Sequence, residues 1–220
     1  MPSKRMPSVS RMKSQVHAAR HHVQNAKSQK SKVKRDIKAA EMKAQSAARR
    51  LAARRSVTYT GAERRYLESV RGRVQRQAEA HPDRRDVFLC HAWDDRAGAA
   101  EELHDYLEQY GVTVWFSEKD IPLGTSLTRE IDKGLRKSHL GIVLVTPAML
   151  QSLAAQGIAD KELSALLATE RVVPVVHEVG FDELREESPL LASRSGLSTQ
   201  GSSLEDVAIK IANAIYPMRE

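Results

Sequence analysis

The sequence predicts an α/β protein in which a long helical arm precedes a doubly wound parallel sheet. Three observations support this prediction. An apolar 3.5-residue repeat runs through residues 9–51, short apolar strands alternate with helices from residue 86 onward, and the charge changes sign between the two regions. Residues 1–85 contain 23 Lys and Arg against 6 Asp and Glu, whereas residues 86–220 contain 12 against 22. This contrast indicates two regions with different roles.

The N-terminal arm is predicted to form a coiled coil. Apolar residues recur at alternating three- and four-residue spacing, and only Lys30 interrupts them. A 3.5-residue repeat kept over about six heptads is typical of a left-handed coiled coil. The seam positions are Val9, Met12, Val16, Ala19, Val23, Ala26, Lys30, Val33, Ile37, Ala40, Ala44, Ala47 and Leu51. The several Ala residues bury little area, so we expect weak self-association, and Lys30 fits either a register-setting residue or a lysine with a buried stem.

A second helix is predicted between Thr60 and Pro82. Thr60, followed three residues later by Glu63, has the spacing of a capping box, and Pro82 would end the helix. An apolar stripe along this helix is formed by Leu67, Val70 and Val74. The two helices together make up the predicted oligomerisation region, residues 1–83, and we expect the sheet domain to cover residues 84–220.

The basic charge of the arm would attract phosphate groups. However, the arm has few aromatic residues for base stacking and no recognised groove-reading motif. The basic charge is better explained as the solvated face of an oligomerising helix, so we expect no nucleic-acid partner. A sensor protein that is tethered to nucleic acid through this arm is the weakest of the alternative functions.

Other features of the sequence indicate a cytoplasmic protein. No apolar run has the length of a membrane span, and no secretory signal follows the basic N-terminus. Cys90 is the single cysteine, so no intramolecular disulfide can form and a reducing compartment is expected.

From residue 84 onward the pattern predicts a sheet of five parallel strands with helices between them. The expected strands are residues 87–90, 112–116, 141–145, 172–176 and 196–199. The expected helices are residues 97–110, 126–137, 160–169 and 204–215. The continuous apolar run Gly141–Val145 is typical of a central strand that is covered on both faces. The alternation of strands and helices predicts a doubly wound sheet of flavodoxin-like strand order.

In such sheets the ligand crevice lies beyond the carboxyl ends of the strands. This rule directs attention to residues 91–93, 117–126 and 146–153. The sequence contains no glycine-rich phosphate loop, no HExxH and no paired CxxC motif, so we expect no metal site and no bound cofactor. A phospho-accepting receiver domain has the same fold class, but it would need a carboxylate at the end of the third strand. This chain has Val145 and Thr146 there, so the sequence argues against a receiver domain.

Several linked motifs resemble those of TIR domains. The segments that carry the resemblance are DVFLCH (86–91), GVTVWF (111–116), DIPLGTS (120–126), the stretch 131–138, GIVLVTP (141–147), KEL (161–163) and VVPV (172–175). The loop 120–126 matches the BB loop of the family. The resemblance covers roughly residues 84–216, and it implies one of two functions. Many bacterial and plant TIR domains cleave the nicotinamide–ribose bond of NAD+, which gives nicotinamide and ADP-ribose or a cyclic isomer, whereas others only assemble protein partners.

The resemblance implies the catalytic residue. In the catalytic members one glutamate on the helix after the third strand is essential, and that position is Glu162 here. Nicotinamide leaves as a neutral base, so the remaining task is to stabilise a ribosyl cation, which a carboxylate near the ribose hydroxyls can do. NAD+ would be the substrate, and no metal or resident cofactor would be required.

The NAD+ contacts of the family map onto Ala92 and Trp93 after the first strand and onto Ser126 in the BB loop. After the second strand the contact maps onto Ser117, Glu118 or Lys119, of which Lys119 gives the best alignment. The indole of Trp93 could stack on a base or on nicotinamide, and His91 is expected to pack rather than to act as a base. One position departs from the pattern. Catalytic members often have Trp four residues before the glutamate, where this chain has Ile158, so either another side chain fills that space or the activity is low.

We expect self-association through the coiled coil and through the BB loop, in particular Asp120, Pro122 and Gly124. Ordered assembly of TIR domains often completes the site in this family, and the arm would raise the local concentration of these domains. The alternative function is a TIR scaffold that binds other TIR domains without catalysis.

Overall fold

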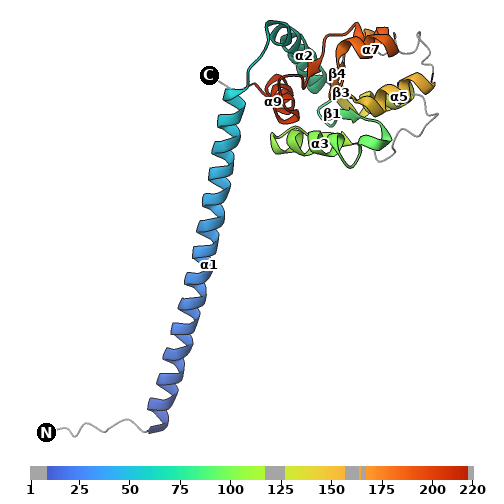
Figure 1. Cartoon of the computed structure of the whole chain (residues 1–220). Helices are drawn as coiled ribbons and strands as arrows, with labels where there is room; N and C mark the ends of the chain where they lie inside the picture. Colours follow the sequence, from blue (N-terminus) through green and yellow to red (C-terminus); the bar gives the residue numbers. More distant parts are fainter. Residues whose placement is uncertain (1–8, 117–126, 157–163, 165–166, 218–220) are drawn as a thin grey trace, which may run out of the picture. The chain divides into compact units, whose positions relative to one another are not determined.

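The computed structural model describes residues 9–116, 127–156, 164 and 167–217. The chain divides into two compact units, Met1–Ala52 and Ala53–Glu220, which we describe separately (Figure 1). The first unit consists of most of helix α1 (Val9–Ser56), and the last turn of this helix belongs to the second unit. Among the helices that the structure describes, none is both long and apolar enough to span a membrane.

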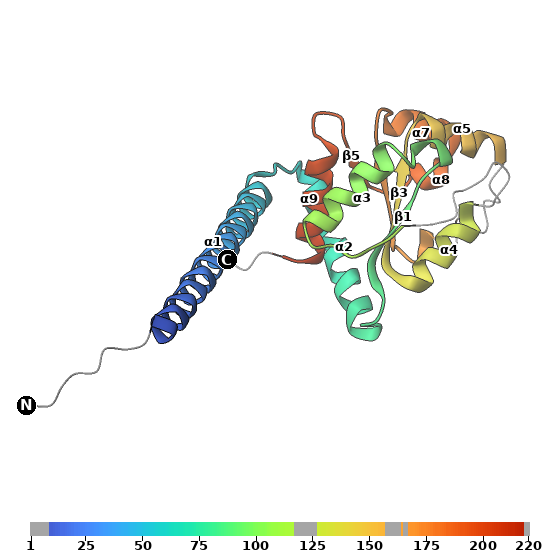
Figure 2. The same cartoon turned by 90° about the horizontal axis from the view of Figure 1, so that it is seen from below.

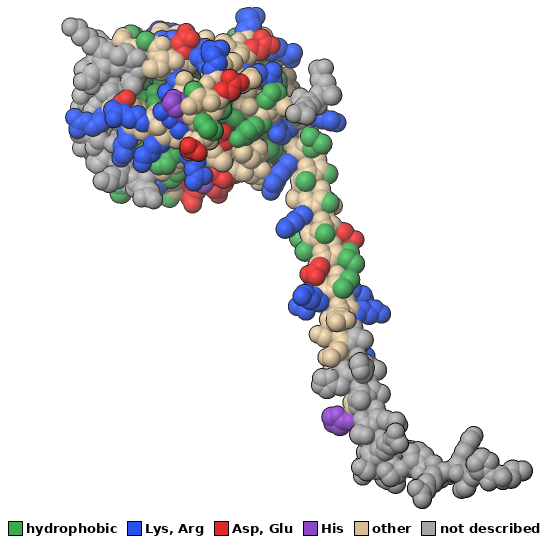
Figure 3. Space-filling view, turned by 180° about the vertical axis from the view of Figure 1, so that it is seen from behind, with side chains coloured by type: hydrophobic (Ala, Val, Ile, Leu, Met, Phe, Trp, Pro, Cys, Tyr) green, Lys and Arg blue, Asp and Glu red, His purple; other side chains and the backbone are tan. Residues whose placement is uncertain are grey.

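Helix α1 is a single helix of 48 residues, as the apolar repeat predicted. Every side chain from Lys27 to Ala52 is exposed, and basic and hydrophobic side chains share the surface of this part of the helix (Figure 3). The seam residues Val33, Ile37 and Leu51 are 55%, 52% and 46% exposed. The helix is therefore confirmed, while its pairing into a coiled coil stays a prediction.

The second unit is built on one parallel sheet with the strand order β2-β1-β3-β4-β5. The strands are β1 (Arg85–Cys90), β2 (Val114–Phe116), β3 (Ser138–Val145), β4 (Val172–Val176) and β5 (Leu197–Ser198). This order is the flavodoxin-like one, so the predicted fold class is confirmed. The last strand is shorter than the four residues predicted, and only Leu197 and Ser198 pair with β4.

The helices of the second unit cover both faces of the sheet (Figure 2). They are α2 (Gly61–Ala80), α3 (Ala99–Gln109), α4 (Leu127–Lys137), α5 (Pro147–Gln156), α7 (Phe181–Glu187), α8 (Pro189–Ala192) and α9 (Leu204–Ile215). Helices α5, α7 and α8 were not predicted, because α7 and α8 are short and α5 follows β3 after a single residue. The helix expected at residues 160–169 lies mostly outside the described residues.

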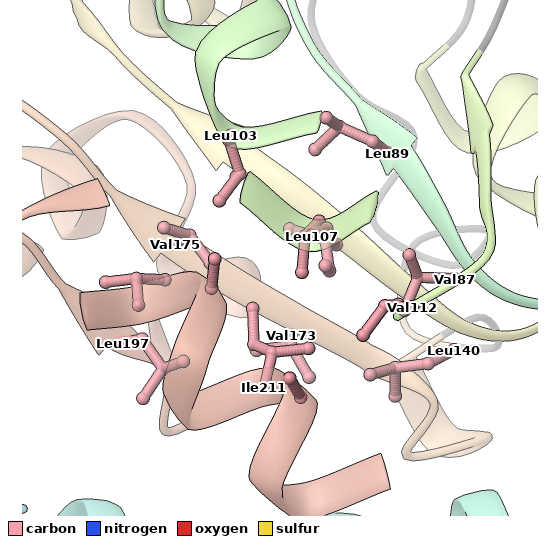
Figure 4. Packing of buried hydrophobic residues seen from close by; sticks show 14 of the residues in the cluster. Val87, Leu89, Leu103, Leu107, Val112, Leu140, Val173, Val175, Leu197 and Ile211 are labelled. Carbon is pink, nitrogen blue, oxygen red and sulfur yellow. The ribbon is translucent and has the colours of Figure 1, made fainter. Parts of the chain in front are cut away.

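Alternation along β1 separates two hydrophobic cores. Val87 and Leu89 point to the core that contains α2, α3 and α9, part of which is drawn in Figure 4. Phe88 and Cys90 point to the other core, which contains α4, α5, α7 and α8. Successive side chains of a strand point to opposite faces, so a single apolar strand supplies both cores.

Helix α2 belongs to the sheet unit. Its buried residues Leu67, Val70 and Val74 join the same core as α3 and α9. The compact unit that contains α2 begins at Ala53, and the division into residues 1–83 and 84–220 stays a prediction. The apolar stripe was visible in the sequence, but the surface that it covers was not. An oligomerising role for the residues before 84 stays a prediction.

Polar contacts fix the start of α2 against α9. The predicted capping box is present, because Glu63 N donates to Thr60 Oγ1 at 3.1 Å and Thr60 N donates to Glu63 Oε2 at 2.8 Å. The other oxygen of Glu63 accepts from Lys210 Nζ of α9 at 2.7 Å. Burial alone would raise the pKa of Glu63, but the bonds from Lys210 and Thr60 outweigh it and lower the pKa below its ordinary value.

We expect Glu63→Gln to destabilise the second unit more at neutral pH than in acid. Because the folded-state pKa of Glu63 lies below its unfolded-state value, the carboxylate contributes stability at neutral pH, and this contribution is lost as the pH falls through the folded pKa. Urea unfolding followed by Trp fluorescence, from about pH 7 down to about pH 3.5, measures the difference in free energy of unfolding between wild type and variant.

The matched control is Glu68→Gln, which changes an exposed carboxylate on the same helix. A wild-type-to-Glu63→Gln difference that stays constant over the pH range, or equals that of Glu68→Gln, would contradict this role of the Glu63–Lys210 pair.

Candidate functional site

The candidate site lies at the carboxyl edge of the sheet, where β1 ends. After Cys90 the chain leaves the core, and a short 3-10 helix, η1 (Trp93–Asp95), follows Ala92. Ala92 is buried, whereas the side chain of Trp93 is 59% exposed. An indole combines a large apolar surface with a polar N–H, so it suits contacts at a partly wet surface. An exposed indole at the edge where doubly wound sheets bind ligands can stack on a flat ring of a ligand.

A hydrogen bond joins the short helix after β1 to the residue that follows β3. The hydroxyl of Thr146, a buried residue, donates to Asp95 Oδ2 at 2.6 Å. The same hydroxyl oxygen accepts from Met149 N at 3.1 Å and so caps the first turn of α5. Asp95 therefore ties the turn that carries Trp93 to the start of the helix after β3.

The environment of Asp95 disfavours its ionised form. Burial raises the pKa of its carboxyl above the ordinary value, and this effect outweighs the hydrogen bonds from Thr146 and Ala92 and the field of His91, which act in the opposite direction. We did not single out Asp95 from the sequence. The available signal was an acidic residue two positions after Trp93, close to the end of a predicted strand.

His91 has the packing role that we expected. The residue is buried, and its ring packs against Phe116 at a centroid distance of 4.7 Å. Its Nδ1 lies 2.9 Å from the carbonyl oxygen of Ala92, and because a carbonyl only accepts, Nδ1 carries the proton and donates. This bond helps to fix the backbone from which Ala92 and Trp93 extend.

The structure places two of the five predicted site residues, Ala92 and Trp93, side by side at the end of β1. The other three, Lys119, Ser126 and Glu162, lie outside the described residues. The same is true of Ile158 and of the BB-loop positions Asp120, Pro122 and Gly124. Within the described part of the chain, no group of three or more His, Cys, Asp or Glu side chains could hold a metal ion.

Comparisons with known proteins identify the family of this chain. The family model described as "TIR domain" matches residues 87–208, which is more than half of the chain. The chain is similar to "NAD(+) hydrolase PdTIR" of Paracoccus denitrificans, with 34% identity over 127 residues, 56% of this chain and 41% of the relative. It is also similar to "2′ cyclic ADP-D-ribose synthase AbTIR" of Acinetobacter baumannii, with 31% identity over 59% of this chain and 49% of the relative.

An archaeal relative, "NAD(+) hydrolase TcpA" of a Theionarchaea archaeon, is 35% identical over 52% of this chain and 35% of its own length. The chain thus spans less than half the length of these curated relatives. The family match nevertheless covers all five strands, except for the first two residues of β1, and most of the helices around them. On this match and on the strand order of the sheet, the chain belongs to the TIR domain family.

Proposed function

We propose that this protein is an NAD+ glycohydrolase that cleaves the nicotinamide–ribose bond. The observation that carries the proposal is the similarity of its TIR region to proteins named NAD(+) hydrolase and 2′ cyclic ADP-D-ribose synthase. Both kinds of relative are represented, so ADP-ribose and a cyclic isomer are both candidate products. The exposed indole of Trp93 at the carboxyl edge of the sheet further supports binding of a ligand with flat rings.

Glu162 is the proposed catalytic carboxylate, by the family resemblance. The departing nicotinamide is neutral, so no acid has to protonate it. The ribosyl group that remains is positively charged in the transition state, and a carboxylate that accepts hydrogen bonds from the ribose hydroxyls stabilises that charge and orients the sugar. Water then attacks the ribose carbon to give ADP-ribose, or a ring nitrogen or hydroxyl of the same molecule attacks it to give a cyclic product.

The proposed NAD+ contacts are Ala92, Trp93, Lys119 and Ser126. Ala92 and Trp93 sit on a turn that the Asp95–Thr146 hydrogen bond holds against α5. A fixed turn lets the indole meet a ring without first being ordered, which lowers the cost of binding. NAD+ is thus a substrate, and the proposed reaction uses no metal or resident cofactor.

Self-association is proposed to support this activity. The exposed seam residues Val33 and Ile37 would be buried if two copies of α1 paired, and pairing raises the local concentration of TIR domains. The BB-loop residues Asp120, Pro122 and Gly124 are the proposed contact between these domains. A scaffold that assembles TIR domains without catalysis is the alternative function.

The first test concerns Glu162. Incubation of the purified chain with NAD+ should release nicotinamide. Glu162→Gln should lower the rate of release by about 10²–10³-fold, because the neutral amide lacks the negative charge that stabilises the ribosyl cation. Chromatography of the products measures the rate. The matched control, Glu187→Gln, changes an exposed glutamate on α7 and should leave the rate unchanged.

Equal rates for Glu162→Gln and wild type would remove the catalytic role from Glu162. If the wild-type chain released no nicotinamide even at high protein concentration, the enzymatic proposal would fail and the scaffold alternative would be favoured.

The second test concerns Trp93. Trp93→Ala should raise KM for NAD+ by about tenfold, because one stacking contact with the substrate is lost. Trp93→Phe should keep part of the affinity, because the phenyl ring can still stack. Because the Trp93 side chain is largely exposed, the free energy of unfolding should change little in either variant. An unchanged KM in Trp93→Ala would show that the indole does not contact the substrate.

The third test separates the seam of α1 from its other faces. Ile37→Asp places a charge in the predicted seam. It should weaken self-association by about tenfold or more, because pairing of the helices would bury this charge in the coiled-coil core. The control Met42→Asp changes a side chain that is 63% exposed but lies outside the seam. Sedimentation measures the assembly, and equal effects of the two substitutions would contradict pairing through the predicted seam.

A further inference from the structure

A strongly basic groove lies in the second unit, between the last turn of α1, the helix α2 and the helix α9. Its volume is about 690 Å³. The charged residues that line it are Arg54, Arg55, Arg64, Arg71, Lys210 and the single acid Glu68. Every residue of the lining lies outside residues 87–208, the part that matches the TIR family. The groove is therefore lined by residues that the family match does not include.

The charge of the groove contrasts with that of the unit that carries it. Residues 53–220 contain 21 Lys and Arg against 26 Asp and Glu, a formal charge of −5. Arg55, Arg64 and Arg71 are exposed. Within the described part of the chain their guanidinium groups form no hydrogen bond or ion pair, although that of Arg64 lies near the ring of Tyr59. Basic residues outnumber the single acid Glu68 in the lining. Like charges gathered in this way repel one another, and a bound anion reduces this repulsion.

The remaining polar residues of the groove are held in place. Arg54 donates to Asn213 Oδ1 at 2.7 Å and to the carbonyl oxygen of Ala212 at 3.2 Å. Asn213 Nδ2 in turn donates to the hydroxyl of Tyr59 at 2.9 Å. These bonds join the end of α1 and the α1–α2 connection to α9, so the walls are formed before a ligand arrives. A preformed site loses less conformational entropy on binding.

Tyr59 adds an aromatic surface to the basic groove. Tyr59 lines the groove and packs partly against the core. The guanidinium of Arg64 and the ammonium of Lys210 each lie 6.0 Å from its ring centroid. Grooves that bind single-stranded nucleic acid combine positive charge along the backbone with aromatic rings on which bases stack. The small number of aromatic residues in the arm argued against nucleic acid from the sequence, but the fold places one of them beside the arginines.

We propose that this groove binds the phosphodiester backbone of a single-stranded nucleic acid. Guanidinium groups match phosphate oxygens in pairs of hydrogen bonds. Arg64 and Arg71 are seven residues apart on α2, a rise of about 10 Å along the helix, which is more than one phosphate requires and suits a chain of phosphates. The proposal does not depend on NAD+ cleavage.

The test uses the full chain and a fluorescein-labelled oligo-dT of about 20 nucleotides, with binding followed by anisotropy over a series of salt concentrations. The double variant R64A/R71A should bind at least about tenfold more weakly. Its salt dependence, the slope of log K against log salt, should fall by about 1.4, because each lost phosphate contact removes about 0.7 for a single strand.

The matched control is R65A/R76A, which removes the same charge from exposed positions of the same helix that do not line the groove. It should weaken binding by less than about threefold. Circular dichroism checks that both variants retain the fold.

Three results would overturn the proposal. The first is equal weakening in R64A/R71A and R65A/R76A, which would assign binding to overall charge. The second is no binding of the oligonucleotide by the wild-type chain at about 0.1 M salt. The third is displacement of the oligonucleotide by polyglutamate as readily as by unlabelled oligo-dT, which would identify an acidic protein as the ligand.

Discussion

Burial of β3 on both faces is the constraint on which the rest of the second unit depends. All eight residues of Ser138–Val145 are buried, so the sheet requires apolar helices on both sides. An unpaired polar group inside either layer would cost free energy, and polar side chains that could act on a ligand are therefore confined to the ends of the strands. Trp93, Asp95 and Thr146 all lie at the carboxyl edge of the sheet for this reason.

At that edge, neighbouring residues have different roles. Asp95 accepts from Thr146, which also caps α5, so the carboxyl is engaged in joining two strand ends. The side chain of Trp93, in contrast, is 59% exposed to solvent. A rigid turn that carries an exposed ring suits a binding surface, whereas the proposed chemistry rests on a different carboxylate, Glu162.

Helix α2 gives this chain features that the TIR match does not include. The helix packs on the same core as α3 and α9, and the Glu63–Lys210 pair fixes its first turn. Because α2 is docked in this way, the arginines on its outer face lie opposite α9 and the end of α1, and they form the basic groove. The helical segment before the family domain is therefore part of the folded unit and not only a connection to the arm.

The sequence by itself determined the local structure. Apolar runs identified the strands, and the spacing of Thr60 and Glu63 identified a helix start, because both signals depend on residues a few positions apart. The sequence also identified the family and two residues, Ala92 and Trp93, that the structure places at the carboxyl edge. It did not reveal the short helices α7 and α8, which are too short to show a helical period.

Only the tertiary structure decided which surfaces meet. The Asp95–Thr146 bond, the Glu63–Lys210 pair and the groove around Arg64 join residues that are distant in the chain. Local patterns show that a stripe is apolar or that a helix is basic, but not what it faces. Those contacts depend on how the sheet orders its strands and on which helix covers each face, so they exist only in the folded chain.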